Sequence, residues 1–115
     1  MDVSTARKRL EGTRDELDRS IMVLQDDRPL EERGEFAPDP ADAGSNLSES
    51  ERTEAVITVA KQQLAEVLDA LHRIDDGSFG TCVDCGKPVP EGRLEAKPEA
   101  ARCVACQGKR DRLRR

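Results

Sequence analysis

Two Cys-x-x-Cys pairs constrain the fold of this chain more than any other feature of its sequence. Cys82 and Cys85 form the first pair, and Cys103 and Cys106 form the second, with seventeen residues between the pairs. A Cys-x-x-Cys turn brings two sulfurs to one ion, and this spacer falls within the range of four-cysteine zinc sites. The spacing therefore predicts a Zn2+ site with these four cysteines as ligands.

The predicted metal site is structural. Four protein ligands leave no coordination position for water. The single histidine, His72, lies ten residues before Cys82 and is interpreted as a half-exposed residue of a helix. A thiol redox switch and an iron–sulfur centre are the alternative uses of the four thiols. The sequence shows no nucleophile-base pair, phosphate-binding glycine loop or HExxH motif, so we expect no enzymatic activity.

The segment around the cysteines can bury little apolar surface. A tiny core is expected from a few apolar residues: Phe79, Val83, Val89, Leu94 and Val104. Metal binding should then supply most of the folding free energy of this module. Four thiolates on Zn2+ carry a formal charge of −2, which four nearby bases could offset: Lys87, Arg93, Lys97 and Arg102.

The rest of the chain is too polar for a large globular core. Apolar residues make up 36% of the 115 residues and charged residues 37%, so an elongated shape is predicted.

We find no apolar leader or membrane-spanning stretch in the sequence and expect a protein of the cytoplasm with no membrane partner. Reducing conditions there favour metal ligation over disulfides.

Apolar residues recur in steps of three and four along two segments, which predicts two helices with heptad seams. The first seam consists of Val3, Ala6, Leu10, Thr13, Leu17, Ser20 or Ile21, and Leu24, and its helix should end near Arg28 before Pro29. The second consists of Val56, Ala60, Gln63, Val67, Leu71 and Ile74, broadened by Ile57, Val59, Leu64, Leu68 and Ala70.

The second helix has both a start and a stop signal. Ser48 and Glu51 fit a capping box, and Asp75-Asp76-Gly77 is a plausible end. Two helices of equal length, roughly 40 Å each, should pack as an antiparallel hairpin, because neither is stable alone with a single apolar stripe. Separate docking of the two helices on partners is the alternative.

Charge is distributed unevenly along the chain. Residues 26 to 51 hold nine acids and two bases, a charge of −7, whereas residues 102 to 115 hold six bases and one acid, a charge of +5. The net charge of −5 makes duplex DNA an unfavourable target. Oppositely charged ends favour a protein partner with complementary patches.

The predicted organisation is all-α. A long antiparallel coiled-coil hairpin occupies residues 1–76, with an acidic tip loop at about 27–47, and a small four-cysteine zinc-finger module with a short basic terminal helix occupies residues 77–115. The terminal helix should begin at Pro98. Within the tip, Asp39 and Asp42 lie three apart, and a solvated turn without function is the alternative reading.

The stretch GSFGTCVDCGKPVPEGRLEAKPEAARCVACQ, residues 77 to 107, resembles the DksA/TraR family of bacterial transcription regulators. The shared features are Cys-x-x-Cys-Gly-x-Pro-hydrophobic-Pro, the run from Arg93 to Ala96, Pro98 and the closing Cys-x-x-Cys-Gln. The resemblance implies a C4-type zinc finger behind a coiled-coil hairpin, so the fold it implies agrees with the heptad pattern.

The resemblance also implies a function. Members of the family bind bacterial RNA polymerase, insert the hairpin into its secondary channel and modulate initiation without binding promoter DNA. Their tip carries Asp-x-x-Asp-x-Ala, which corresponds here to Asp39, Asp42 and, in place of the alanine, Gly44. Some members respond to ppGpp, which implies an anion or partner contact for the basic tail: Lys109, Arg110, Arg112, Arg114 and Arg115.

The alternative functions are a zinc-ribbon module that binds nucleic acid through this tail and a thiol-based redox sensor. We expect a monomer.

Overall fold

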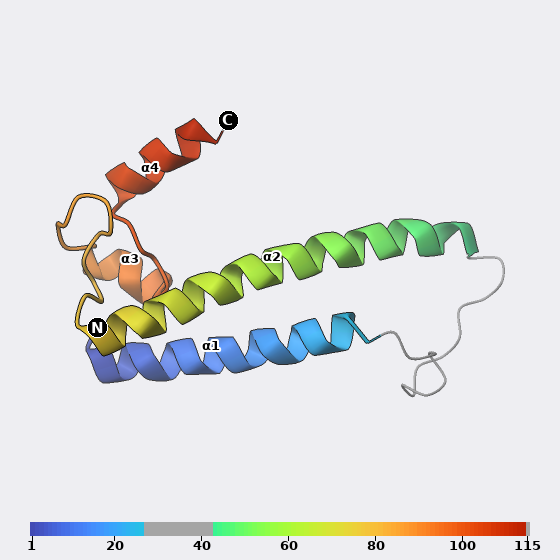
Figure 1. Ribbon diagram of the computed structural model, residues 1–115, viewed down its shortest axis with the longest axis horizontal. Helices are drawn as coiled ribbons and strands as arrows, with labels where there is room; N and C mark the ends of the chain where they lie inside the picture. Colours follow the sequence, from blue (N-terminus) through green and yellow to red (C-terminus); the bar gives the residue numbers. More distant parts are fainter. Residues whose placement is uncertain (27–42, 115) are drawn as a thin grey trace.

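The protein is an elongated helical hairpin with a small module at one end (Figure 1). The computed structural model describes residues 1–26 and 43–114, with only the backbone of 43–48. Its described part contains four helices: α1 (Val3–Leu24), α2 (Ala43–Asp76), α3 (Glu91–Ala96) and α4 (Val104–Leu113). The molecule measures 56 × 34 × 20 Å along its principal axes. The all-α fold, the antiparallel α1–α2 hairpin and the elongated shape are thus confirmed.

Local hydrogen bonds fix the start of α1 and the end of α2, the two helix ends that adjoin the cysteine module. The Asp2 side chain accepts a hydrogen bond of 2.7 Å from the Thr5 N–H, which caps the start of α1. At the end of α2, Gly77 has φ +84° and the Ser78 N–H donates to the Arg73 carbonyl at 2.9 Å. This is a Schellman ending, in which glycine adopts the left-handed conformation without strain. The predicted stop at Gly77 is confirmed.

The two helices differ in length, and the expectation of equal lengths is wrong. α1 has 22 residues and α2 has 34, which correspond to about 33 and about 51 Å. α1 ends at Leu24, a few residues before the predicted end near Arg28. α2 begins at Ala43, so Ser48 lies inside the helix and the predicted capping box is wrong. Pro40 is the last helix-breaking residue before this segment, and the helix can therefore start sooner than the cap motif indicated.

The hairpin is held together by an apolar cluster near the end that adjoins the cysteine module. Half-buried Leu17 and Phe79 pack against this cluster, whose buried members are Ala6, Leu10, Val67, Ala70, Leu71 and Ile74. Farther along the hairpin, Ile21 is buried and Ser20 is exposed, which decides between the two predicted positions. The first seam is otherwise as predicted, except that Val3 is 51% exposed.

The second seam is shifted by one residue at two positions. Val56 is 53% exposed and Gln63 is exposed, whereas Ile57 is buried and Leu64 is half-buried. The residues that face α1 therefore follow steps of three and four throughout: Ile57, Ala60, Leu64, Val67, Leu71 and Ile74. The broad apolar surface of α2 concealed this register, because Val59 and Leu68 on its outer face are also apolar.

The module after Gly77 is built from turns and two short helices. Thr81 and Pro88 form an isolated antiparallel bridge within it. α3 was not predicted, although Pro90 directly precedes it and proline is favoured at helix starts. The terminal helix was predicted, but α4 begins at Val104 and not at Pro98, which lies between α3 and α4.

Polar contacts fix this module on the hairpin. The Arg9 guanidinium of α1 donates a hydrogen bond of 2.7 Å to the Glu95 carbonyl at the end of α3. Lys97 lies 3.5 Å from the Glu66 carboxylate of α2. Phe79 contacts both the hairpin cluster and the small core beside the cysteines. The module therefore has a defined orientation at the end of the rod.

Candidate metal centre and basic cleft

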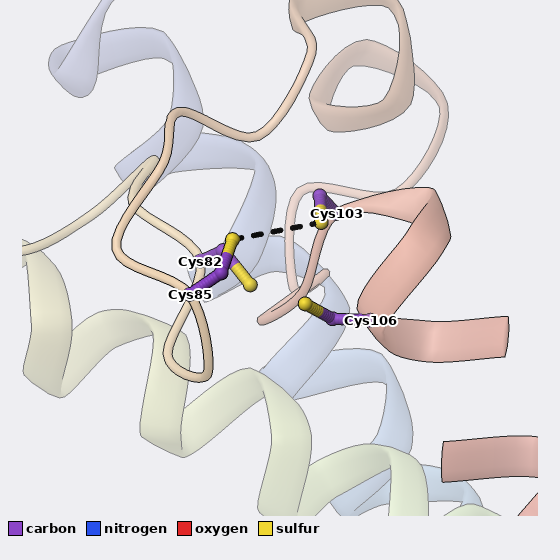
Figure 2. A group of neighbouring side chains, drawn as sticks. All are labelled: Cys82, Cys85, Cys103 and Cys106. Atoms are coloured by element: carbon purple, nitrogen blue, oxygen red, sulfur yellow. Dashed lines mark hydrogen bonds between the residues drawn. The ribbon is translucent and has the colours of Figure 1, made fainter. Parts of the chain in front are cut away.

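The four cysteines converge on one point (Figure 2). Their sulfur atoms all lie within 4.8 Å of one another, and the Sγ atoms of Cys85 and Cys103 are 3.8 Å apart. A tetrahedral ion with zinc–sulfur bonds of about 2.3 Å has sulfur–sulfur edges of about 3.8 Å. All four cysteines are free thiols. The donor set and its spacing therefore fit a four-coordinate Zn2+ ion.

Backbone hydrogen bonds fold the first cysteine pair into a tight turn. The Cys82 N–H donates to the Lys87 carbonyl at 2.8 Å, and the Gly86 N–H donates to the Cys82 carbonyl at 3.0 Å. Gly86 has φ +74°, a conformation that glycine adopts without strain. The bridge between Thr81 and Pro88 closes the base of this turn. Cys82 and Cys85 are thereby directed to the same side.

The second pair lies at the start of α4. Cys103 occupies the position before the helix, and its carbonyl accepts a hydrogen bond of 2.9 Å from the Gln107 N–H. Cys106 follows in the first turn of α4, where three residues of helical backbone place it beside Cys103. A turn and a helix start thus supply two sulfurs each.

Hydrogen bonds shift the pKa values of three of the cysteine thiols in different directions. The backbone N–H groups of Cys85 and Cys103 lower the pKa of Cys82 to about 6. The N–H of Cys106 lowers the pKa of Cys103, whereas the hydrogen bond to the Cys103 sulfur raises the pKa of Cys106 to about 12. The thiolates compete because four negative charges cannot gather without a cation. The four cysteines would hold a Zn2+ ion as thiolates, and the ion would supply that cation.

The core around the cysteines is small, as predicted, but its composition differs. Cys82, Val89 and Leu94 are buried, and Phe79, Cys103 and Cys106 pack against them. Val83 is 50% exposed and Val104 is 64% exposed, so their assignment to the core is wrong. Each follows a cysteine whose side chain faces the centre, and the next side chain in the turn or helix start points elsewhere. His72 is exposed on α2 and is not part of the sulfur cluster.

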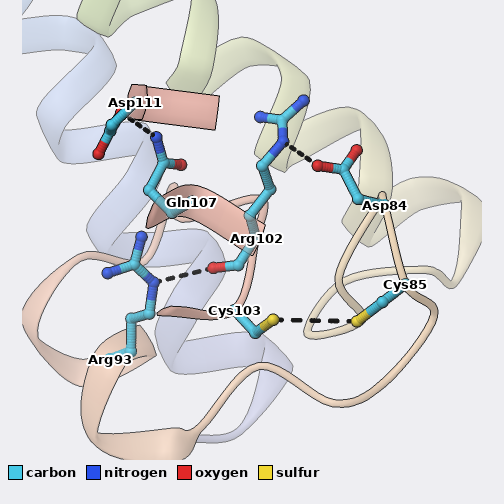
Figure 3. Close-up of polar contacts among 7 residues, drawn as sticks. All are labelled: Asp84, Cys85, Arg93, Arg102, Cys103, Gln107 and Asp111. Carbon is cyan, nitrogen blue, oxygen red and sulfur yellow. Dashed lines mark hydrogen bonds and ion pairs between the residues drawn. The ribbon is translucent and has the colours of Figure 1, made fainter. Parts of the chain in front are cut away.

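Three of the four bases expected near the sulfurs have other partners. Arg102 donates to the Asp84 carboxylate at 2.7 Å, and Arg93 donates to the Arg102 carbonyl at 2.8 Å (Figure 3). Lys97 pairs with Glu66 of α2. Lys87 is exposed.

A cleft of about 260 Å³ lies between α2, α4 and the segment that joins α3 to α4. Two residues of the predicted basic tail, Arg110 and Arg114, line it. Four further bases line it as well: Arg73, Arg93, Lys97 and Arg102. Burial lowers the pKa of Arg73. Arg73 was not predicted as a functional residue, because it lies on α2 and far from the basic tail in the sequence. Glu66, Asp69 and Glu99 add acidic groups to the wall.

Other predicted residues are not brought together. Lys109 and Arg112 are exposed on α4 and do not line the cleft. Asp39, Asp42 and Arg115 lie outside the described residues, as does most of the predicted tip loop.

Within the described ranges, we find no helix with the length and apolar character needed to span a membrane.

Comparison with known proteins identifies the cysteine module. Residues 77–112 match the prokaryotic dksA/traR C4-type zinc finger. The RNA polymerase-binding transcription factor DksA of Caulobacter vibrioides is 35% identical over 88 residues, which are 75% of this chain and 61% of that protein. The chain thus spans less than two thirds of the length of this relative. The relative is named a transcription factor, which is the class of protein that the resemblance in the sequence implied.

Solved structures extend the likeness to the hairpin. The transcription factor DksA2 of Pseudomonas aeruginosa superimposes with a TM-score of 0.74 at 25% identity, over 97% of this chain and 84% of that one. The DnaK suppressor protein of Agrobacterium tumefaciens is 31% identical with a TM-score of 0.63, over 95% and 94% of the two chains. The chain therefore belongs to the DksA/TraR family with a C4-type zinc finger, and Zn2+ is the metal that its four clustered cysteines fit.

Proposed function

We propose that this protein is a cytoplasmic regulator of transcription initiation that binds bacterial RNA polymerase through the secondary channel. In this proposal Cys82, Cys85, Cys103 and Cys106 hold a structural Zn2+, and Asp39 and Asp42 at the tip modulate the polymerase. The family membership and the naming of the Caulobacter relative as RNA polymerase-binding support it.

The observation that carries the proposal is the separation of the two functional ends. The cysteine module adjoins the start of α1 and the end of α2, whereas the other ends of these helices, Leu24 and Ala43, lie at the opposite end of the hairpin (Figure 1). The segment between Leu24 and Ala43 carries Asp39 and Asp42 in its sequence. A rod of this kind can present acidic groups inside a narrow channel while its base stays outside.

Charge supports the same arrangement. The segment from 26 to 51 carries −7, as nine acids against two bases, and the chain from 102 to 115 carries +5, as six bases against one acid. The acidic segment would face mobile or basic elements near a metal-containing catalytic centre, where complementary charge gives specificity. The basic α4 would stay at the channel rim.

The tail has a second proposed role. Arg110 and Arg114 of α4 line the cleft together with Arg73 and Arg102, and guanidinium groups bind phosphate oxygens well. These bases support a contact with the phosphates of ppGpp. A response to ppGpp stays a prediction.

A double substitution, Asp39→Asn with Asp42→Asn, tests the tip mechanism. The zinc-loaded variant should bind RNA polymerase within a few-fold of the original affinity, in competition with a known secondary-channel factor, and should lose its effect on transcription in vitro. Glu31→Gln with Glu32→Gln is the matched control, because it removes the same charge from the same segment and should keep the effect.

Undiminished regulation by the Asp39/Asp42 variant would reject the tip mechanism. Absence of polymerase binding by the unmodified protein would reject the proposed function. It would favour the two alternatives: nucleic-acid binding through the basic tail and redox sensing by the thiols.

A further inference from the structure

An ion pair joins the two cysteine pairs without using a sulfur atom (Figure 3). The Nε of Arg102 donates to an Oδ2 of Asp84 at 2.7 Å. Asp84 directly precedes Cys85, and Arg102 directly precedes Cys103. The Arg102 side chain is 19% exposed and that of Asp84 is 45% exposed, so the contact is partly shielded from solvent.

Two further hydrogen bonds hold this junction in place. The Val83 N–H of the first turn donates to the Ala101 carbonyl at 3.0 Å. The Nε of Arg93, on α3, donates to the Arg102 carbonyl at 2.8 Å. Arg102 is therefore fixed both through its side chain and through its backbone. None of these contacts involves a metal ligand atom.

We propose that the Asp84–Arg102 pair is a clasp that holds the two cysteine pairs in position around the Zn2+ site. Without this contact, the ion would have to contribute more to closing the seventeen-residue segment between Cys85 and Cys103, at a cost in chain entropy. A charge-assisted hydrogen bond that is partly buried contributes more than a fully exposed ion pair does. Asp84 and Arg102 are thus positioning residues, and the inference rests on the proposed set of four cysteine ligands.

A purely electrostatic role for these residues predicts a different result. Four thiolates on Zn2+ carry a formal −2, so loss of the Arg102 charge should weaken metal binding, whereas loss of the Asp84 charge should strengthen it. A clasp predicts that both losses weaken binding, because either one breaks the same contact. The sign of the Asp84 effect therefore separates the two explanations.

The test measures transfer of Zn2+ from the full chain to a colorimetric chelator. Asp84→Ala and Arg102→Gln should each release the ion about tenfold faster, on the scale seen for residues that support metal ligands. The double variant should release it no faster than either single variant, because the contact is already lost. Asp111→Asn is the matched control, since Asp111 carries the same charge in the same module but bonds within α4 to Gln107.

Slower release from Asp84→Ala, or additive effects in the double variant, would overturn the proposal. Cobalt-substituted protein provides a second readout: unchanged ligand-field bands in the variants show that the four sulfurs still bind and that only positioning has changed, whereas altered bands would contradict a positioning role. If neither single variant takes up metal, the variant Arg102→Lys tests the proposal instead. It keeps a charged donor, so release within threefold of the original rate supports the clasp, and failure to bind metal overturns it.

Discussion

The hairpin and the zinc finger are stabilised in opposite ways. In the hairpin, a cluster of six buried residues from two helices excludes water along an apolar seam, with half-buried residues around it. In the finger, the buried cluster consists of Cys82, Val89 and Leu94, one of which is a proposed metal ligand. In the hairpin, many buried side chains share the stabilisation. In the finger, four sulfur atoms surround one point, and the ion that they would bind is expected to stabilise the module.

This difference predicts two kinds of response to damage. Loss of one seam residue removes a share of the buried apolar area and leaves the remaining contacts, so stability should decline in graded steps. Loss of one cysteine removes a ligand from a site whose metal-binding free energy should supply most of the folding free energy of the module. The finger should therefore respond in an all-or-none manner.

Cys106→Ser should produce the largest effect. Structural zinc sites supply an apparent free energy of about 10 to 16 kcal/mol, which a three-sulfur site cannot retain in full. Amide hydrogen exchange should show lost protection in residues 77–114, while the helical circular dichroism of α1 and α2 stays.

Val104→Ala is the control for this substitution, because Val104 lies in the same turn of α4 but is 64% exposed. It should leave exchange in the finger unchanged. Full protection of the finger after Cys106→Ser would mean that its core suffices without the ion, and the contrast between the two regions would fail.

Leu10→Ala should have a moderate effect that is confined to the hairpin. Leu10 is fully buried, and truncation of a buried leucine costs about 2 to 5 kcal/mol. Leu68→Ala, on a side chain that is 47% exposed, should cost less than about 1 kcal/mol. Urea denaturation followed by helical circular dichroism measures both.

The same variants test whether the two regions are independent. The rate of Zn2+ transfer to a chelator should stay within twofold of the original for both leucine variants. Faster release from Leu10→Ala would show that the hairpin core supports the metal site, through Phe79 or the contacts of Arg9 and Lys97 with the finger.

Asp2→Ala should have the smallest effect, and that effect depends on pH. The hydrogen bond from the Thr5 N–H lowers the pKa of Asp2 below its ordinary value of 3.8. A carboxylate with a lowered pKa in the folded state stabilises the protein above its unfolded pKa, and this contribution disappears as the pH falls through the folded value. The urea midpoint of the variant should lie below that of the original protein by a constant difference between about pH 5 and 8.

That difference should close as the pH falls below 3.8. Asp18→Ala, in the middle of α1, is the control and should not lower the midpoint. A gap between Asp2→Ala and the original protein that persists in acid would show that the cap acts through something other than the ionised carboxylate.

Much of the metal site could be predicted, because each cysteine pair and its turn are formed by residues that are close together in the sequence. The spacing of four cysteines limits the ligand geometry, and Gly86 permits the turn between the first two. The basic cleft could not be predicted, because it combines Arg73 of α2 with Arg110 and Arg114 of α4, residues that adjoin only after the finger docks on the hairpin. The pairing of Asp84 with Arg102 has the same origin, since their sequence separation of 18 gives no periodic signal.

The sequence by itself determined that two amphipathic helices precede a four-cysteine module and that α2 stops at Gly77. These features follow from heptad spacing, ligand spacing and the backbone freedom of glycine, all of which act over a few residues. The tertiary structure decided which residues face the seam. Ile57 and Leu64 are turned inward in place of Val56 and Gln63, because the outer face of α2 is also apolar and only contact with α1 selects between neighbouring positions.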